Sequence, residues 1–152
     1  MSLSYVKSPE PTLIKLEDSP IWREACDIAE LMYNKLGDLP ESEKWDTTAK
    51  LQHEANDLML HVSHAVGGSS VNSNEYDWSS ARKSVSALKT IYRFAGRQKF
   101  IELEPEIMVR FDKLIVLIDQ EIIKTYKQSE ADKEKDLDYW QEKYKLWKAT
   151  EI

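Results

Sequence analysis

The stretch SPIWREACDIAELMYNKLG, residues 19–37, decides the fold class of this chain. Ser19 and Pro20 make a favourable helix start, because serine can cap the first free backbone N–H groups and proline suits the first helical position. Gly37 suits the end of the same helix. Apolar residues between them recur at helical spacing and share one face, which predicts an amphipathic helix. They are Ile21, Trp22, Ala25, Ile28, Ala29, Met32 and Leu36.

A second helix is expected to begin at Leu39-Pro40-Glu41 and to end at Gly67-Gly68, with a polar loop through Asn74. Its predicted buried stripe consists of Trp45, Thr48, Leu51, Ala55, Leu58, Met59, Val62 and Val66. A third helix is expected from about residue 75 to residue 95, with Gly96 as its cap. Its apolar face carries Trp78, Ala81, Val85, Leu88, Tyr92 and Ala95.

A fourth helix is expected to begin near Glu104-Pro105. Its stripe consists of Ile107, Met108, Phe111, Leu114, Ile115, Ile118 and Ile122. A chain of 152 residues with few glycines and prolines, all between periodic segments, is typical of one helical domain. We therefore predict an all-α protein, an up-and-down antiparallel four-helix bundle over residues 19–128. Residues 1–18 are expected to form an extended N-terminal arm.

Residues 129–152 are predicted to form an additional amphipathic C-terminal helical tail, rich in charged and aromatic residues. Four of its residues recur at alternating three- and four-residue steps, as along a coiled-coil edge: Leu137, Trp140, Tyr144 and Trp147. We call these four the aromatic seam. The seam is expected to dock on the chain's own bundle, on a sister subunit or on a dedicated partner. Val116 and Ile123, beside the main stripe, fit either a wider buried arc under the tail or a subunit interface.

Composition excludes several classes of function. The net charge of −6 is atypical of a generally basic nucleic-acid binder, and the lone Cys26 cannot form an internal disulfide. Without an apolar run of membrane-spanning length or a signal-peptide core, a cytoplasmic protein with no membrane partner is expected. No sequence motif of a catalytic or phosphate-binding site is present. We therefore predict no enzyme, no catalytic residue, no cofactor and no small-molecule substrate.

The second predicted helix carries His53, Asp57, His61 and His64, whose spacing places them on one side. Imidazole and carboxylate groups can share a cation, but one helix face rarely supplies a complete site. This side lies opposite the apolar stripe and is expected to be solvated. We therefore predict no metal site.

Charge is divided unevenly between neighbouring helices. Residues 38–66 carry two basic and six acidic side chains, whereas residues 75–100 carry six basic and two acidic ones. Four cations on the third helix form a stripe about 22 Å long, which could follow a nucleic-acid backbone: Arg82, Lys89, Arg93 and Arg97. The alternative is that helices two and three neutralise each other across the bundle.

Several short motifs resemble the bacterial four-helix-bundle protein family, which includes proteins encoded in ribosomal RNA intervening sequences and the accessory variability determinant of diversity-generating retroelements. They are Ile21-Trp22-x-x-Ala25, Leu39-Pro40-x-x-Glu43, Gly67-Gly68, Tyr76-x-x-x-x-Ala81-Arg82-x-Ser84-Val85-x-x-Leu88, Phe94-Ala95-Gly96-x-x-Lys99-Phe100-Ile101 and Leu114-Ile115-x-x-Ile118. The resemblance spans about residues 19–127. It implies an up-and-down bundle, a homopentameric ring and, in the retroelement branch, a basic protein that binds nucleic acid and works with a reverse transcriptase.

Two hypotheses of function follow from the sequence. The first is a non-enzymatic, oligomeric accessory protein that binds nucleic acid or a nucleoprotein partner through the basic stripe. The second is a protein–protein interaction scaffold that uses its acidic faces and the aromatic seam.

Overall fold

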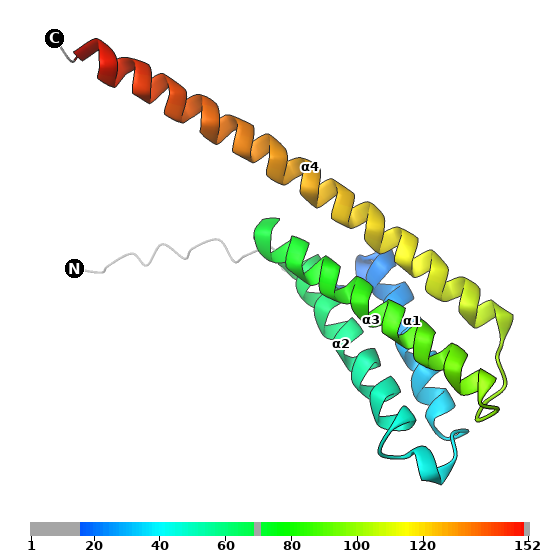
Figure 1. The fold of residues 1–152 in the computed structure, drawn as a ribbon. Helices are drawn as coiled ribbons and strands as arrows, with labels where there is room; N and C mark the ends of the chain where they lie inside the picture. The colour runs from blue at the N-terminus through cyan, green and yellow to red at the C-terminus, as the bar shows by residue number, and fades with distance from the viewer. Residues whose placement is uncertain (1–15, 69–70, 151–152) are drawn as a thin grey trace, which may run out of the picture.

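The computed structural model describes residues 16–68 and 71–150, with the side chains of residues 71–74 left aside, and these residues form an all-helical bundle (Figure 1). The elements are η1 (Leu16–Asp18), α1 (Pro20–Leu36), η2 (Glu41–Glu43), α2 (Thr47–Gly67), α3 (Val71–Arg97) and α4 (Pro105–Thr150). Successive helices run in alternating directions and α4 packs against both α3 and α1. The predicted up-and-down four-helix bundle is thereby confirmed. Of the predicted N-terminal arm, only residues 16–18 are described, and they form a 3-10 turn.

The first helix begins and ends where its sequence predicts. The Ser19 side chain accepts a hydrogen bond from the backbone N–H of Trp22 at 3.3 Å, and Pro20 is the first helical residue. The helix buries Ala25, Ile28, Ala29 and Met32. Both end signals lie in the local sequence, so this helix needs no tertiary information to be located.

The second helix begins later than predicted. Residues Glu41–Glu43 form the separate 3-10 turn η2 after Pro40, and α2 starts at Thr47. Because Trp45 lies between the two elements, it falls out of the α2 stripe and is 87% exposed. Thr47, rather than Thr48, is buried, and its hydroxyl donates to the Glu43 carboxylate at 2.8 Å. The prediction of a buried Trp45 was wrong because the turn breaks the helical register.

The third helix is longer than predicted at both ends. It starts at Val71, so the polar segment through Asn74 is helical; serine and asparagine favour helix starts as well as loops. Gly96 is helical rather than the cap: a Cβ atom there would lie 2.2 Å from Leu103 Cγ. Lys99 takes the left-handed position after the helix, with φ 61°, and the Phe100 N–H closes the turn on the Ala95 carbonyl at 2.9 Å.

The core lies between the four helices and uses most of the predicted stripes. Its largest fully buried side chains are Tyr92, Phe111, Ile28, Met32, Leu51, Leu58, Leu88, Leu114 and Ile118. Arg110 of α4 joins the periphery by ion pairs to Glu24 at 3.0 Å and Asp27 at 3.2 Å, both on α1. Aligned stripes and a short rim of ion pairs therefore fix α4 against the bundle.

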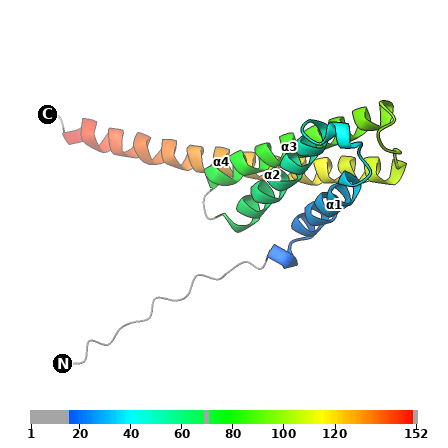
Figure 2. The same ribbon diagram turned by 90° about the horizontal axis from the view of Figure 1, so that it is seen from below.

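The fourth helix runs without a break from Pro105 to Thr150, 46 residues, and so is about 70 Å long. The predicted C-terminal tail is thus the continuation of α4 rather than a separate helix. Its last turns extend far beyond the ends of α1, α2 and α3 in both views (Figures 1 and 2). Every residue from 130 to 150 is exposed.

Candidate functional site

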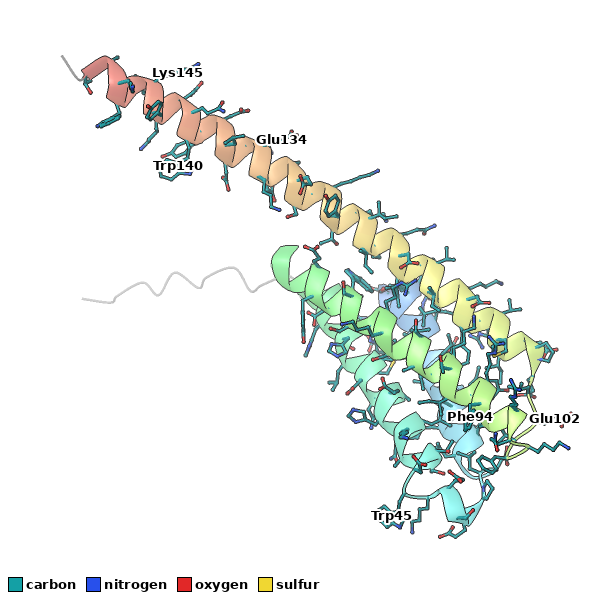
Figure 3. The ribbon with its side chains drawn as sticks, in the orientation of Figure 1. Trp45, Phe94, Glu102, Glu134, Trp140 and Lys145 are labelled. Atoms are coloured by element: carbon teal, nitrogen blue, oxygen red, sulfur yellow. The ribbon has the colours of Figure 1, made fainter. Side chains whose placement is uncertain are left out.

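The aromatic seam lies on the projecting part of α4 and is uncovered by the chain that the structure describes. Its four side chains are between 55% and 66% exposed: Leu137, Trp140, Tyr144 and Trp147. Figure 3 shows Trp140 reaching from the helix into open space beyond the bundle. The seam is therefore presented as one apolar strip on a rod of helix.

The tail does not dock on its own bundle. That alternative for the seam is wrong for the described chain, and a sister subunit or a separate partner is left. Val116 and Ile123 are also exposed, at 54% and 53%, so the predicted buried arc under the tail is wrong as well. Val116 lines a shallow apolar hollow on α4 with Val109 and Leu117. The helix thus has apolar surface in two places, on the bundle and on the tail.

The seam has its own local geometry. Tyr144 and Trp147 pack ring against ring with centroids 5.9 Å apart, and Lys148 lies over the Tyr144 ring at 5.6 Å. A shallow hollow runs between Trp140, Lys143, Tyr144 and Trp147. An exposed pair of aromatic rings with a lysine ammonium over one of them resembles the aromatic anchors of protein interfaces.

Charge on the tail is segregated along its length. Residues 129–138 carry five acidic and two basic side chains, whereas residues 139–150 carry one acidic and three basic ones. All the charged side chains from Glu130 to Lys148 are exposed. This segregation of charge is visible in the sequence, but it becomes informative only once the tail is known to be one uncovered helix.

The basic stripe is divided into two halves by the structure. Arg82 pairs with Asp119, and Lys89 pairs with Asp112, both on α4. The predicted neutralisation between α2 and α3 therefore occurs between α3 and α4 instead. Arg93 and Arg97 are exposed, and neither forms a salt bridge with any acidic residue in the described ranges.

Arg93 and Arg97 border a hollow at the end of α3. Phe94, which is 55% exposed, and Leu103 provide its apolar wall, and Thr90 completes it. Figure 3 shows Phe94 near the C-terminal end of α3. Guanidinium groups beside an open aromatic ring can contact a phosphate and a stacked base together.

The histidines of α2 do not converge. His53 contacts Asp57 at 3.1 Å, whereas His61 turns toward α3, where its Nδ1 lies 3.7 Å from the Asp77 carboxylate. His61 is half-buried beside Tyr76, so the expected solvated position was wrong for this residue. Among residues 16–68 and 71–150, no group of three or more possible ligands is placed to hold a metal ion.

Two titratable groups near α1 have shifted pKa values. Partial burial, and then the carboxylates of Glu30 and Asp27, raise the pKa of the Cys26 thiol. A hydrogen bond to Glu104 raises the pKa of Lys35, whose Nζ lies 2.7 Å from that carboxylate. The thiol is therefore held protonated at neutral pH, which disfavours a nucleophilic role.

No protein-family model matches this chain, and no curated protein is significantly similar to it. The resemblance to the four-helix-bundle family therefore stays a prediction. The helices that the structure describes contain no stretch long and apolar enough to cross a membrane.

Proposed function

We propose that this protein is a non-enzymatic interaction scaffold whose working surface is the aromatic seam of α4, and that its partner presents another amphipathic helix. One observation carries the proposal: four large apolar side chains share a face of a helix that leaves the bundle, and each stays more than half exposed. Surface of this kind marks protein interaction sites.

A helical partner suits the shape and chemistry of the seam. The seam is a narrow strip with coiled-coil spacing, about 15 Å from Leu137 to Trp147, and charged residues flank it. At about 100–170 Å² of open surface on each side chain, the strip offers on the order of 500 Å² for burial. A second helix laid along the strip covers all four side chains at once, whereas a globular surface does not follow so narrow a face.

Site-specific photo-crosslinking tests this proposal. A photoreactive amino acid replaces Trp140 in the full chain, and the matched control carries it at Glu142, on the opposite face of the same turn. We expect a discrete crosslinked species from position 140 alone, and a synthetic peptide of residues 129–150 should suppress it. Equal crosslinking at both positions, or none at either, would contradict the proposal.

A second candidate function is nucleic-acid binding, which the hollow beside Arg93 and Arg97 favours. These two cations are not engaged by acidic residues of the described chain, and Phe94 adds an open ring. Two phosphate contacts predict weak binding, with log affinity falling by about 1.4 to 1.8 per decade of salt.

Fluorescence anisotropy with labelled single-stranded and duplex DNA tests this candidate across a salt series. Replacing Arg93 and Arg97 by glutamine should abolish the binding, whereas the same change at Arg82 and Lys89 should leave most of it, because those cations are paired. If the two double variants bind alike, or no binding occurs at low salt, this candidate fails.

On the family resemblance alone, we further propose an accessory role beside a reverse transcriptase and assembly into a homopentameric ring. Such a ring would repeat the end of α3 five times and raise the avidity for one nucleic acid. A ring built through the bundle should survive deletion of residues 129–152, so the mass of that variant in sedimentation measures this part of the proposal.

A further inference from the structure

We infer that the helix that covers the aromatic seam is the tail of a second copy of this chain, running antiparallel to the first. This inference rests on the proposed scaffold function and names the partner. In the pairing that we infer, Leu137 lies opposite Trp147 of the second copy, and Trp140 lies opposite Tyr144 of the second copy. The twofold symmetry of the pair then places the reciprocal contacts at the other end.

The residue order along the seam selects this register. Antiparallel helices pair the first core position of one heptad with the second core position of the other, and the inferred alignment matches all four seam residues with seam residues. A shift by one heptad in one direction would place Lys133 against Tyr144 and Glu130 against Trp147. A shift in the other direction would place Trp140 against Glu151.

The segregated charge of the tail selects the direction. Antiparallel tails bring the acidic half of one copy beside the basic half of the other, and Glu134 then flanks Lys148 of the second copy at both ends. The only like-charge contact in this arrangement is Lys143 with its own symmetry mate. Parallel tails would place Lys143 beside Lys148 of the second copy twice, with no opposite charge to offset the repulsion.

The length of the tail and its area fit this pairing. The exposed part of α4 from residue 130 to residue 150 is about 30 Å long. In the inferred register residues 134–150 of the two tails overlap, over about 25 Å, and each bundle stays outside the overlap. Two seams together bury on the order of 1,000 Å², which lies at the lower end of specific interfaces. The dimer is therefore expected to form at micromolar rather than nanomolar concentration.

Sedimentation equilibrium of the full chain, from about one to several hundred micromolar, is compared with the variant that lacks residues 129–152, so that tail pairing is separated from any ring formed through the bundle. Lys148→Glu places Glu134 beside a glutamate of the second copy at both ends and should weaken the dimer about tenfold. The double variant Glu134→Lys with Lys148→Glu restores opposite charges and should recover the affinity. Lys145→Glu is the matched control, because it makes the same charge change one turn away but off the seam, and it should change little.

Each result of the sedimentation experiment supports or overturns a particular part of the inference. A dimer that Lys148→Glu strengthens would be parallel and would overturn the inferred direction, because Lys143 would gain an opposite charge. A chain that stays monomeric throughout would overturn the inference outright. If such a monomer still gives a crosslink from position 140 to a different protein, the scaffold function stands and only the partner was wrong; if it gives none, both fail. Circular dichroism of each variant checks that α4 keeps its helical content.

Discussion

Replacing Tyr92 by phenylalanine removes one oxygen atom from the end of the bundle where α3 meets the connection to α4, and should weaken the start of α4. The Tyr92 side chain is fully buried, and its hydroxyl accepts the backbone N–H of Glu104 at 2.9 Å, one residue before α4 begins. A longer contact of 3.5 Å joins the same hydroxyl to the carbonyl of Glu102. Tyr92 of α3 thus anchors the connection to α4.

The Tyr92→Phe variant leaves the N–H of Glu104 without its partner. An unsatisfied, partly buried backbone donor costs about 1–2 kcal/mol, and the longer contact adds little because it is near the limit of a hydrogen bond. The free energy of unfolding should fall by that amount, measured by urea titration of the helical circular dichroism signal. Tyr126→Phe, at an exposed position on α4, is the matched control and should change it by less than about 0.5 kcal/mol.

Two results would refute this reasoning. If Tyr92→Phe and Tyr126→Phe lower the stability equally, the hydroxyl does not hold the α3–α4 connection. If the loss is large but amide hydrogen exchange at Glu104 is unchanged, the destabilisation arises elsewhere in the core. The expected result is faster exchange at this amide with little change in the middle of α4, because only the start of the helix loses its anchor.

Four further outcomes follow from the same structure. Trp45→Ala should change the free energy of unfolding by less than about 0.5 kcal/mol, whereas Trp78→Ala, at a 4% exposed position, should lower it by about 3–5 kcal/mol in urea titrations. Because its pKa is raised, Cys26 should react with a thiol reagent at pH 8 more slowly in the native than in the unfolded chain. Because the pKa of the Cys26 thiol is higher in the folded than in the unfolded chain, the thiol contributes to the free energy of unfolding below its ordinary pKa of 9.0. This contribution is lost as the pH rises above that value, and urea titrations at pH 8 and pH 10 measure the difference. Replacing Asp112 and Asp119 together by asparagine should lower stability by no more than about 1–2 kcal/mol, because both ion pairs are partly exposed, and thermal unfolding measures the loss.

The parts of the fold that depend on local chemistry were predictable from the sequence. Ser19, Pro20 and Gly37 bound α1 correctly because capping is a local interaction. The start of α2 was not predictable in the same way, since Pro40 opens either a helix or a short turn and the register of Trp45 depends on which one forms. Gly96 is a further case: its role follows from the approach of Leu103, a contact that no local pattern contains.

The candidate sites were also predictable only where they depend on local sequence spacing. Spacing alone placed the aromatic seam on one face, but its exposure follows from the length of α4 relative to its neighbours. The partners of the basic stripe left a signal in the sequence: Arg82 and Lys89 are seven residues apart, as are Asp112 and Asp119 in the reverse order. Antiparallel helices bring such reversed spacings together, so α4 rather than α2 supplies the counter-charges. Continuing this alignment places Arg93 opposite Met108, which explains why that arginine has no acid across from it.

The lengths of the helices make the tail the feature that most needs a partner. The longest neighbour of α4 is α3, with 27 residues against 46, so about 28 Å of α4 has no helix beside it within the described chain. A polar helix standing alone in water is marginal, and its stability comes from packing an apolar face. The seam supplies such a face, but Glu130 and Lys133 interrupt its continuation toward the bundle, so extending the bundle's own core cannot cover it. We therefore expect a covering helix from outside the bundle, and the opposite charges at the two ends of the tail favour a second tail as that helix.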